Sequence, residues 1–402
     1  MPVNHHEKVN TSKWPFAPHV LALQTSVIKE VLKISSHPGV ISFAGGLPAP
    51  DLFPLEELQE AMALSVKKYK SDCMQYSLSR GILPLREALA RQATENGAPT
   101  GVDNIIITSG AQQALEVVAR AFIDPGDYIL TENPTYLGAM QAFNYYGARY
   151  VTVEMDDEGM LVDQVAASIE KYKPKLIYTV SNFQNPTGIT LSLKRRHTLN
   201  ETALHYGIPI VDDNPYWNIR FEGEPIPTLK SIGGDEIIEL GTFSKTVAPG
   251  LRIGWMNGSA NIMPQFEKVK QCTDLHTNTL CQYMLYEYIN AGNLEPHIET
   301  IKANYRNKRN VMLGAMREFF PEEVTWTEPN GGLFLWVELP SHLSARELLP
   351  KAIEAKVAYV YGQPFFPNQG GENCLRLNFS NASPDEIVRG IKRLGILFKE
   401  NI

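Results

Sequence analysis

Short apolar runs alternate with longer amphipathic stretches between about residue 84 and residue 260, and this alternation constrains the fold most strongly. It is typical of an α/β domain whose sheet is largely parallel. Helices are expected between the strands, for example over 112–121 and 193–206. Each expected strand is bounded by Gly, Pro, Asp or Asn. The expected strands cover 105–108, 128–130, 176–180, 208–211 and 237–240.

The length of the chain predicts more than one domain. A single hydrophobic core stops growing near about 250 to 300 residues, and this chain has 402. After residue 290 the pattern changes to a long charged helix over 295–319 and strands within 331–337 and 374–379, which indicates a separate α+β unit. The first 55 residues contain one expected helix and an irregular Gly-Gly-Leu-Pro stretch, so we expect them to lie across other parts. The predicted domains are 1–55 (an N-terminal arm and part of a small domain), 56–290 (a large domain) and 291–402 (the small domain).

Charge and cysteine content exclude several classes of function. The net charge of −7 offers no broad basic field for nucleic acid or an anionic membrane. No apolar run reaches the roughly 18 to 20 residues that span a bilayer, and no basic segment followed by an apolar run marks a signal peptide, so a cytoplasmic location is expected. The four cysteines lack any C-x-x-C pairing, which predicts reduced thiols and no metal site. They are Cys73, Cys272, Cys281 and Cys374.

A lysine flanked by hydroxyls and an arginine follows the expected strand 237–240. Thr242 and Ser244 can donate hydrogen bonds to phosphate oxygens, and Arg252 can pair with them bidentately. Lys245 can condense with an aldehyde carbon. The segment therefore suits a phosphorylated aldehyde.

A carboxylate and a tyrosine follow the strand 208–211, at the end where open α/β sheets bind ligands. Asp213 could keep the pyridine nitrogen of pyridoxal phosphate protonated, as the chemistry of that cofactor requires. Tyr216 could donate to the phenolate oxygen of the ring. Together with Lys245, these residues predict pyridoxal phosphate as cofactor.

The segment Ser181-Asn182-Phe183-Gln184-Asn185-Pro186-Thr187-Gly188 resembles the Asn-x-x-Asn-Pro-x-Gly signature of class I and II aminotransferases. From the Gly45-Gly46 segment to Arg376, the order of motifs is similar to that of fold-type I pyridoxal-phosphate enzymes, in particular the 2-aminoadipate and broad-specificity branch. The resemblance covers nearly the whole chain. It implies a mostly parallel seven-stranded sheet flanked by helices, with a smaller α+β domain. It also implies that Asn185 bonds the phenolate oxygen of the cofactor.

The same resemblance assigns a phosphate site and a stacking residue. Ser109, Gly110, Ala111 and Gln112 open a helix whose N–H groups point at an anion. Tyr136 matches the aromatic residue that stacks on the pyridine ring. Two positions depart from the pattern: Ala111 stands where several relatives have a hydroxyl residue, and Ser181 stands where many have proline.

Further residues are assigned to the substrate and to a second subunit. Tyr76 resembles the tyrosine that reaches across a homodimer interface to the partner's phosphate. Arg376 matches the arginine that clamps the α-carboxylate of the substrate. Gly46 is expected beside the substrate, and Arg80 is a candidate for a distal carboxylate. The aromatic residues expected near the pocket, which would suit aromatic or long aliphatic side chains, are Phe43, Tyr136 and Phe366.

The implied activity is the transfer of an amino group from an L-amino acid to a 2-oxo acid, 2-oxoglutarate or pyruvate, by ping-pong kinetics. A C–S β-lyase and a decarboxylase stay open, because both use the same lysine. A cofactor-sensing regulatory module also stays open, since similar domains occur fused to helix-turn-helix transcription factors. The roughly forty residues before the Gly45-Gly46 segment are not basic and contain no evident recognition helix.

Overall fold

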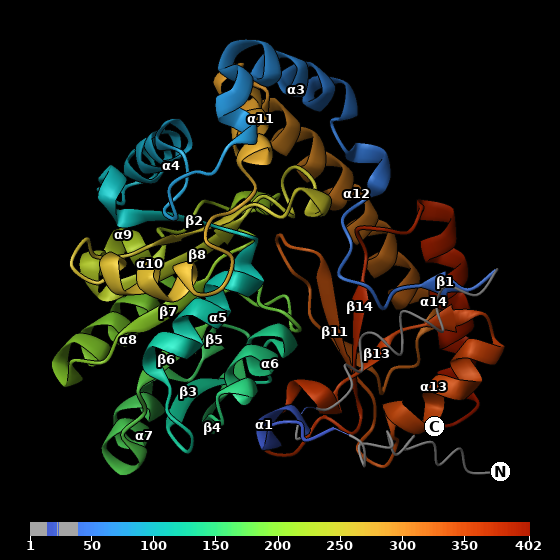
Figure 1. Cartoon of the computed structure of the whole chain (residues 1–402). Helices are drawn as coiled ribbons and strands as arrows, with labels where there is room; N and C mark the ends of the chain where they lie inside the picture. The colour runs from blue at the N-terminus through green and yellow to red at the C-terminus, as the bar shows by residue number, and fades with distance from the viewer. Residues whose placement is uncertain (1–13, 22, 24–38) are drawn as a thin grey trace.

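The computed structural model describes residues 14–21, 23 and 39–402 (Figure 1). Its largest sheet has eight strands in the order β2-β9-β8-β7-β6-β3-β4-β5. The strands are β2 (Ile105–Thr108), β3 (Tyr128–Asn133), β4 (Arg149–Asp156), β5 (Gly159–Met160), β6 (Leu176–Thr179), β7 (Ile210–Asp213), β8 (Ile237–Thr242) and β9 (Gly254–Asn257).

The sheet is mostly parallel, as predicted. Strands β4, β3, β6, β7 and β8 run parallel to one another. Strand β9 runs antiparallel between β8 and β2. The predicted α/β fold is confirmed, but the sheet has eight strands instead of seven, because the two-residue strand β5 folds back on β4.

Helices cover both faces of this sheet. On one face, side chains such as Tyr178 and Val211 pack with helices α5 and α6. On the other face, Ile177 and Ile210 pack with α7 and α8. Strands buried on both faces read as continuous apolar runs, which is why the sequence shows them clearly. The helices of this part are α3 (Leu55–Tyr69), α4 (Leu83–Glu95), α5 (Ala111–Phe122), α6 (Leu137–Tyr145), α7 (Val165–Tyr172), α8 (Leu193–Tyr206), α9 (Leu229–Gly233), α10 (Met263–Gln271) and α11 (Thr279–Asn290).

The ends of α8 follow from its sequence. The Ser192 hydroxyl accepts a hydrogen bond from the Arg195 N–H, and Gly207 ends the helix in the left-handed conformation. Both are favoured terminal residues. Short 3-10 turns join other elements: η2 (Pro50–Leu52), η3 (Lys70–Met74), η4 (Val102–Asn104), η5 (Val162–Gln164), η6 (Trp217–Ile219), η7 (Gly234–Glu236), η8 (Pro249–Leu251) and η9 (Gln363–Phe365).

A second, antiparallel sheet has the strand order β10-β11-β14-β13. Helices α12 and α14 pack against each other beside it (Figure 1). A capping box between Ser383 and Glu386 fixes the start of α14. The elements are α12 (Leu294–Phe319), β10 (Thr325–Trp326), β11 (Phe334–Glu338), α13 (Ala345–Glu354), β12 (Val357–Ala358), β13 (Val360–Tyr361), β14 (Cys374–Asn378) and α14 (Pro384–Lys399).

The N-terminal part reaches this second unit. Strand β1 (Ile41–Ser42) pairs in parallel with β12. Helix α1 (Pro18–Leu21) is the part of the expected N-terminal helical region that the structure describes, and the rest lies outside the described residues. Within the described ranges, no helix is both long and apolar enough to cross a bilayer.

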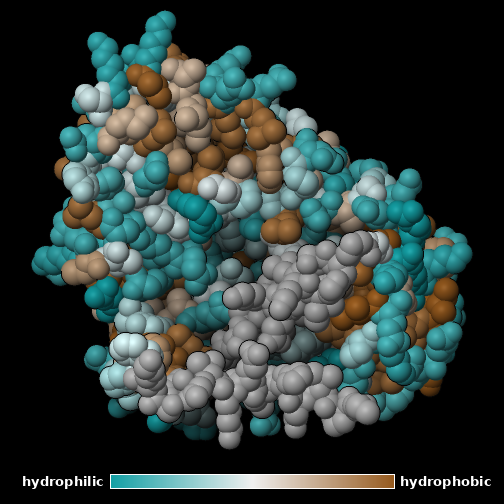
Figure 2. All heavy atoms as spheres, turned by 45° about the vertical axis from the view of Figure 1, so that its right-hand side comes forward, coloured by the Kyte–Doolittle hydropathy of each residue, from teal (hydrophilic) through white to brown (hydrophobic). Residues whose placement is uncertain are grey.

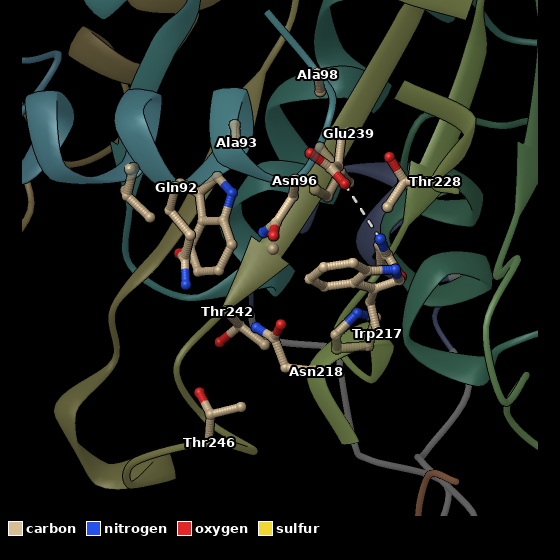
Figure 3. A pocket seen from close by; sticks show the side chains of 16 residues that line it. Gln92, Ala93, Asn96, Ala98, Trp217, Asn218, Thr228, Glu239, Thr242 and Thr246 are labelled. Carbon is tan, nitrogen blue, oxygen red and sulfur yellow. Dashed lines mark hydrogen bonds between the residues drawn. The ribbon is translucent and has the colours of Figure 1, made fainter. Parts of the chain in front are cut away.

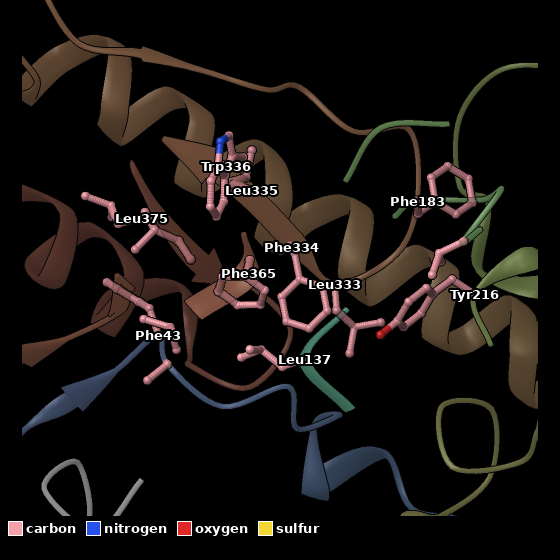
Figure 4. Packing of buried hydrophobic residues seen from close by; sticks show 14 of the residues in the cluster. Phe43, Leu137, Phe183, Tyr216, Leu333, Phe334, Leu335, Trp336, Phe365 and Leu375 are labelled. Carbon is pink, nitrogen blue, oxygen red and sulfur yellow. The ribbon is translucent and has the colours of Figure 1, made fainter. Parts of the chain in front are cut away.

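A large apolar cluster connects the two sheets (Figure 4). It includes Phe43, which the sequence analysis placed near the substrate. A Cβ atom at Gly390 of α14 would lie 2.5 Å from the Phe43 ring, so this ring packs tightly against α14. Phe43 is therefore a core residue, and its expected place near the pocket stays a prediction.

Candidate active site

The candidate residues come together where five strands of the large sheet end. Ser109 follows β2, Tyr136 follows β3, Asn185 follows β6, Asp213 ends β7 and Lys245 follows β8. The carboxyl ends of parallel strands lie at one edge of a sheet, and the antiparallel β9 leaves β2 and β8 pointing the same way. This edge is the general ligand site of open α/β sheets.

Lys245 lies at the centre of this edge. Its Nζ donates a hydrogen bond to the Gly46 carbonyl at 2.7 Å. Burial lowers the pKa of Lys245 from 10.5 to about 8, and the positive charges of Arg376 and Arg252 act in the same direction, against the opposing charge of Asp213. At pH 7 about a tenth of this amine is therefore unprotonated, far more than for an ordinary lysine, and the unprotonated form is the one that a nucleophile or a base requires.

Two adjacent aspartates at the end of β7 point to opposite faces of the sheet. Asp212 accepts hydrogen bonds from the Ser181 N–H and hydroxyl on the α8 side. Asp213 faces the other side, where its Oδ2 accepts from the Tyr178 hydroxyl at 3.0 Å. Its Oδ1 is buried with no partner. Burial raises the pKa of Asp213 to about 7, so this carboxylate is costly to keep ionised without a cation.

Arg376 lies in the central part of the second sheet and reaches the same site. Its Nη1 donates to Asn185 Oδ1 and its Nη2 to the Ala44 carbonyl, both at 2.7 Å. Its Nε is buried without a partner, and no carboxylate of the described residues pairs with it. Burial lowers the pKa of Arg376 to about 10. A substrate carboxylate would supply the missing charge.

Aromatic rings surround this arginine. The guanidinium carbon lies 4.2 Å from the ring centre of Phe334 and 5.2 Å from that of Phe365. Figure 4 shows these two rings close together, with Leu137 beside them. Asn185 also hydrogen-bonds the Tyr216 hydroxyl, and burial raises the pKa of Tyr216 well above its ordinary value. Tyr216 is therefore a neutral donor.

The first turn of α5 forms a second corner of the site, whose free N–H groups could hold an anion. Gly110 precedes it with a positive φ of 82°, and a Cβ atom there would lie 2.3 Å from Arg252 Nη2. Only glycine lets this guanidinium approach the turn, where Nη2 donates to the Ser109 carbonyl at 3.2 Å. The N–H groups of Ala111 and Gln112 belong to the first helical turn and have no partner within the helix. The Thr242 hydroxyl lies 2.9 Å from that of Ser244.

The Ser109 N–H of this corner differs from the expectation, and two side chains have partners within the protein. The Ser109 hydroxyl donates to Asp274 Oδ2 at 2.9 Å, and its N–H donates to Gln113 Oε1. The Gln112 side-chain amide donates to the Gly138 carbonyl at 2.9 Å. Both side chains are engaged elsewhere, so the backbone supplies the free donors of this corner.

Three further candidates lie outside this arrangement. The Arg80 guanidinium is paired with Glu267 at 2.6 Å and Asp103 at 3.5 Å, so its expected substrate contact is corrected to a structural ion pair. Tyr76 is 79% exposed. Phe366 packs over Gly370 and Gly371.

Sequence reasoning missed a buried arginine beneath the signature loop. Arg196 of α8 is fully buried and donates to the carbonyls of Leu191, Pro227 and Ser181 and to Asn182 Oδ1. The sequence could have indicated this residue, because Arg196 lies on the same helical face as the apolar Leu199 and Ala203. A charged side chain on a buried face needs hydrogen-bond partners.

Glu132 was also missed. This buried carboxylate accepts from the Thr179 hydroxyl, the Val180 N–H and the Gln184 amide. Gln184 in turn donates to the Pro134 carbonyl at 2.8 Å. The network ties the loop that carries Asn185 to the loop before Tyr136. Its partners lie about fifty residues apart, so no local pattern shows it.

A separate cavity lies on the other side of β8 (Figure 3). It shares Thr242 with the candidate site, but neither Lys245 nor Arg376 lines it. Its one carboxylate, Glu239, accepts from the Asn214 amide at 3.1 Å. This cavity therefore does not contain the lysine and the arginine of the strand-end site.

Comparisons with known proteins agree with this geometry. The family model of class I and II aminotransferases matches residues 40–394. Aromatic-amino-acid aminotransferase 1 of Thermococcus litoralis is 42% identical over 394 residues, covering 96% of this chain and 94% of that protein. The 2-aminoadipate transaminase of Thermus thermophilus is 39% identical over 383 residues, covering 94% of each. The solved kynurenine aminotransferase of Pyrococcus horikoshii has a TM-score of 0.94 and 40% identity, covering 98% of this chain and 99% of that one.

Proposed function

This chain belongs to the class I and II aminotransferases, which use pyridoxal phosphate to move an amino group between amino and 2-oxo acids, and we propose that its donors are amino acids with aromatic or long side chains. The amino acceptor is 2-oxoglutarate or pyruvate. The observation that supports the choice of donor is the pair of rings, Phe334 and Phe365, whose centres lie 4.2 and 5.2 Å from the guanidinium carbon of Arg376. The names of the relatives support it.

The residues of the site fit pyridoxal phosphate. The buried Asp213 Oδ1 suits the protonated ring nitrogen. The first turn of α5, Arg252, Thr242 and Ser244 suit the phosphate. Asn185 and Tyr216 suit the phenolate oxygen of the ring, and Tyr136 is assigned to its face.

Different residues of the chain have different roles in the transfer of the amino group. When bound, pyridoxal phosphate supplies an aldehyde that accepts the amino group and a ring that withdraws electrons from the α-carbon of the substrate. Arg376 binds the α-carboxylate and so orients the Cα–H bond. The Lys245 Nζ takes the α-proton and returns it as general base and acid. The side chains of Tyr216 and Asn185 stay hydrogen-bonded to each other during the transfer.

A panel of amino donors tests the proposed substrates. We expect phenylalanine, tyrosine, kynurenine and 2-aminoadipate to give higher kcat/KM with 2-oxoglutarate than alanine or serine. Ping-pong kinetics should appear as parallel double-reciprocal lines. Preference for short donors would contradict the proposal. Release of ammonia and pyruvate from cysteine-like substrates without any 2-oxo acid would favour a β-lyase.

The pKa of Lys245 predicts how the apoenzyme takes up its cofactor. The reactive neutral amine predominates above about pH 8 and is lost as pH falls through that value. The rate of uptake should therefore level off above a midpoint near pH 8, as followed by the absorbance of bound cofactor. A rate that still rises about sevenfold between pH 9 and 10 would indicate an ordinary lysine.

The proposed assembly is a homodimer with a shared site. An exposed apolar surface lies over α3 and the segment that carries Tyr76, and Figure 2 shows apolar side chains gathered in this upper part of the molecule. Large exposed apolar patches mark interaction sites. In a homodimer formed through this surface, Tyr76 of one subunit would reach the cofactor phosphate in the site of the other. The exposed apolar residues are Leu55, Met62, Leu64, Val66, Met74, Leu78 and Leu83.

Tyr76→Phe tests the shared site. The loss of one hydrogen bond to a charged group should weaken cofactor binding about tenfold, while sedimentation still reports a dimer. Tyr172→Phe, an exposed tyrosine of α7, is the matched control. A monomer in sedimentation, or equal dissociation constants for both variants, would oppose the proposal.

The cytoplasm is the proposed location, supported by four free cysteines. Cell fractionation tests it. We also propose the expected domain bounds: 1–55 for the N-terminal arm and part of the small domain, 56–290 for the large domain and 291–402 for the small domain.

A further inference from the structure

The parallel pairing of β6 with β7 brings a tyrosine to Asp213. Tyr178 is in register with Val211. Side chains alternate along a strand, so Val211 and Asp213 face the same side as Tyr178. The Tyr178 hydroxyl donates to Asp213 Oδ2 at 3.0 Å.

The two oxygens of Asp213 are therefore unequal. Oδ2 has a donor, whereas Oδ1 is buried without one. Without the tyrosine, the carboxylate could rotate, and either oxygen or neither would face the site. One fixed hydrogen bond removes that freedom.

Tyr178 is itself held rigidly and stays a donor. It is 1% exposed, and its ring packs edge-on against Phe143 of α6 with centroids 5.5 Å apart. Burial and the nearby Asp213 charge raise the pKa of Tyr178 well above its ordinary value. Its hydroxyl keeps its proton at any pH near neutrality.

We propose that Tyr178 is a positioning residue: its hydroxyl fixes the Asp213 carboxylate so that Oδ1 alone is presented to the cofactor ring nitrogen, and it stabilises the ionised form of that carboxylate. The inference rests on the proposed role of Asp213. It predicts that Tyr178 acts on cofactor affinity only through that carboxylate.

A double-mutant cycle on cofactor binding tests this. The dissociation constant of pyridoxal phosphate is measured by fluorescence titration of apoenzyme for the wild type, Tyr178→Phe, Asp213→Ala and the double variant. Tyr178→Phe should weaken binding about 10- to 100-fold, the size expected for a lost hydrogen bond to a charged group. In the Asp213→Ala background, the same change should alter the constant less than about twofold.

Tyr150→Phe is the matched control. It removes a tyrosine hydroxyl from β4 of the same sheet, where that hydroxyl donates to Asn144 Oδ1 at 2.7 Å, and should leave cofactor affinity unchanged. Thermal melting of each variant checks that it is folded.

The outcomes separate the two ideas. If Asp213→Ala weakens binding but Tyr178→Phe does not, or if Tyr178→Phe is equally harmful in both backgrounds, the positioning role is overturned and Asp213 keeps its own. If Asp213→Ala leaves binding unchanged, the role of Asp213 falls, and the inference falls with it.

Discussion

Replacing Lys245 with alanine is expected to lower turnover by at least about 10⁴-fold, because one amine serves both as the nucleophile for the cofactor aldehyde and as the base for the α-proton. No other described amine donates to the Gly46 carbonyl at this edge of the sheet. Steady-state kinetics with a good donor and 2-oxoglutarate measure the loss. Borohydride reduction of the loaded wild type, followed by peptide mapping, should place the pyridoxyl group on residue 245.

Lys194→Ala is the control, since this exposed lysine of α8 lies outside the site. It should keep both turnover and labelling. Substantial transamination by Lys245→Ala, or a label on a different lysine of the wild type, would refute the assignment of the base.

Replacing Asp213 with asparagine is expected to lower kcat about 10²- to 10⁴-fold. The substitution keeps the shape but removes the charge opposite the ring nitrogen, and breaking a buried ion pair costs about 3 to 5 kcal/mol. The Tyr178 hydroxyl can still donate to the asparagine oxygen. A loss in kcat larger than the loss in folding stability would locate the effect in the reaction.

The neighbouring residue gives a closely matched control. Asp212 is equally buried on the opposite face, where it bonds Ser181. Asp212→Asn should lower the melting temperature but leave kcat within about fivefold, because Asp212 bonds Ser181 on the face away from the site. Equal kinetic losses in the two variants would mean that burial of charge at this strand end, and not contact with the ring nitrogen, explains the effect.

Much of the fold is predictable because its signals are local. Helix α8 matches the predicted range, and β2 matches its apolar run. Strand β4 was not singled out, because its side chains alternate between buried and exposed and form no apolar run. Strand β7 begins at Ile210, two residues after the predicted start, and continues through Asp213.

The site was predictable where residues are fixed by motif, and not where partners are remote. Arg80 was predicted as a substrate contact, but its guanidinium forms an ion pair with Glu267, which lies 187 positions away in the sequence. The Ser109 hydroxyl turns to Asp274, 165 positions away. Arg196 and Tyr178 act through bonds made across the sheet and its loops, so a strand pattern shows only that they are buried.

One short stretch contacts both charged ends of the site. After β1 pairs with β12, the Ala44 carbonyl accepts from Arg376 and the Gly46 carbonyl accepts from Lys245. Residues 41–46 thus connect the C-terminal sheet to the lysine loop of the large sheet through these two hydrogen bonds. A rigid shift of one sheet against the other must stretch or release the bond on the lysine, so relative motion of the two halves and the availability of that amine are physically coupled.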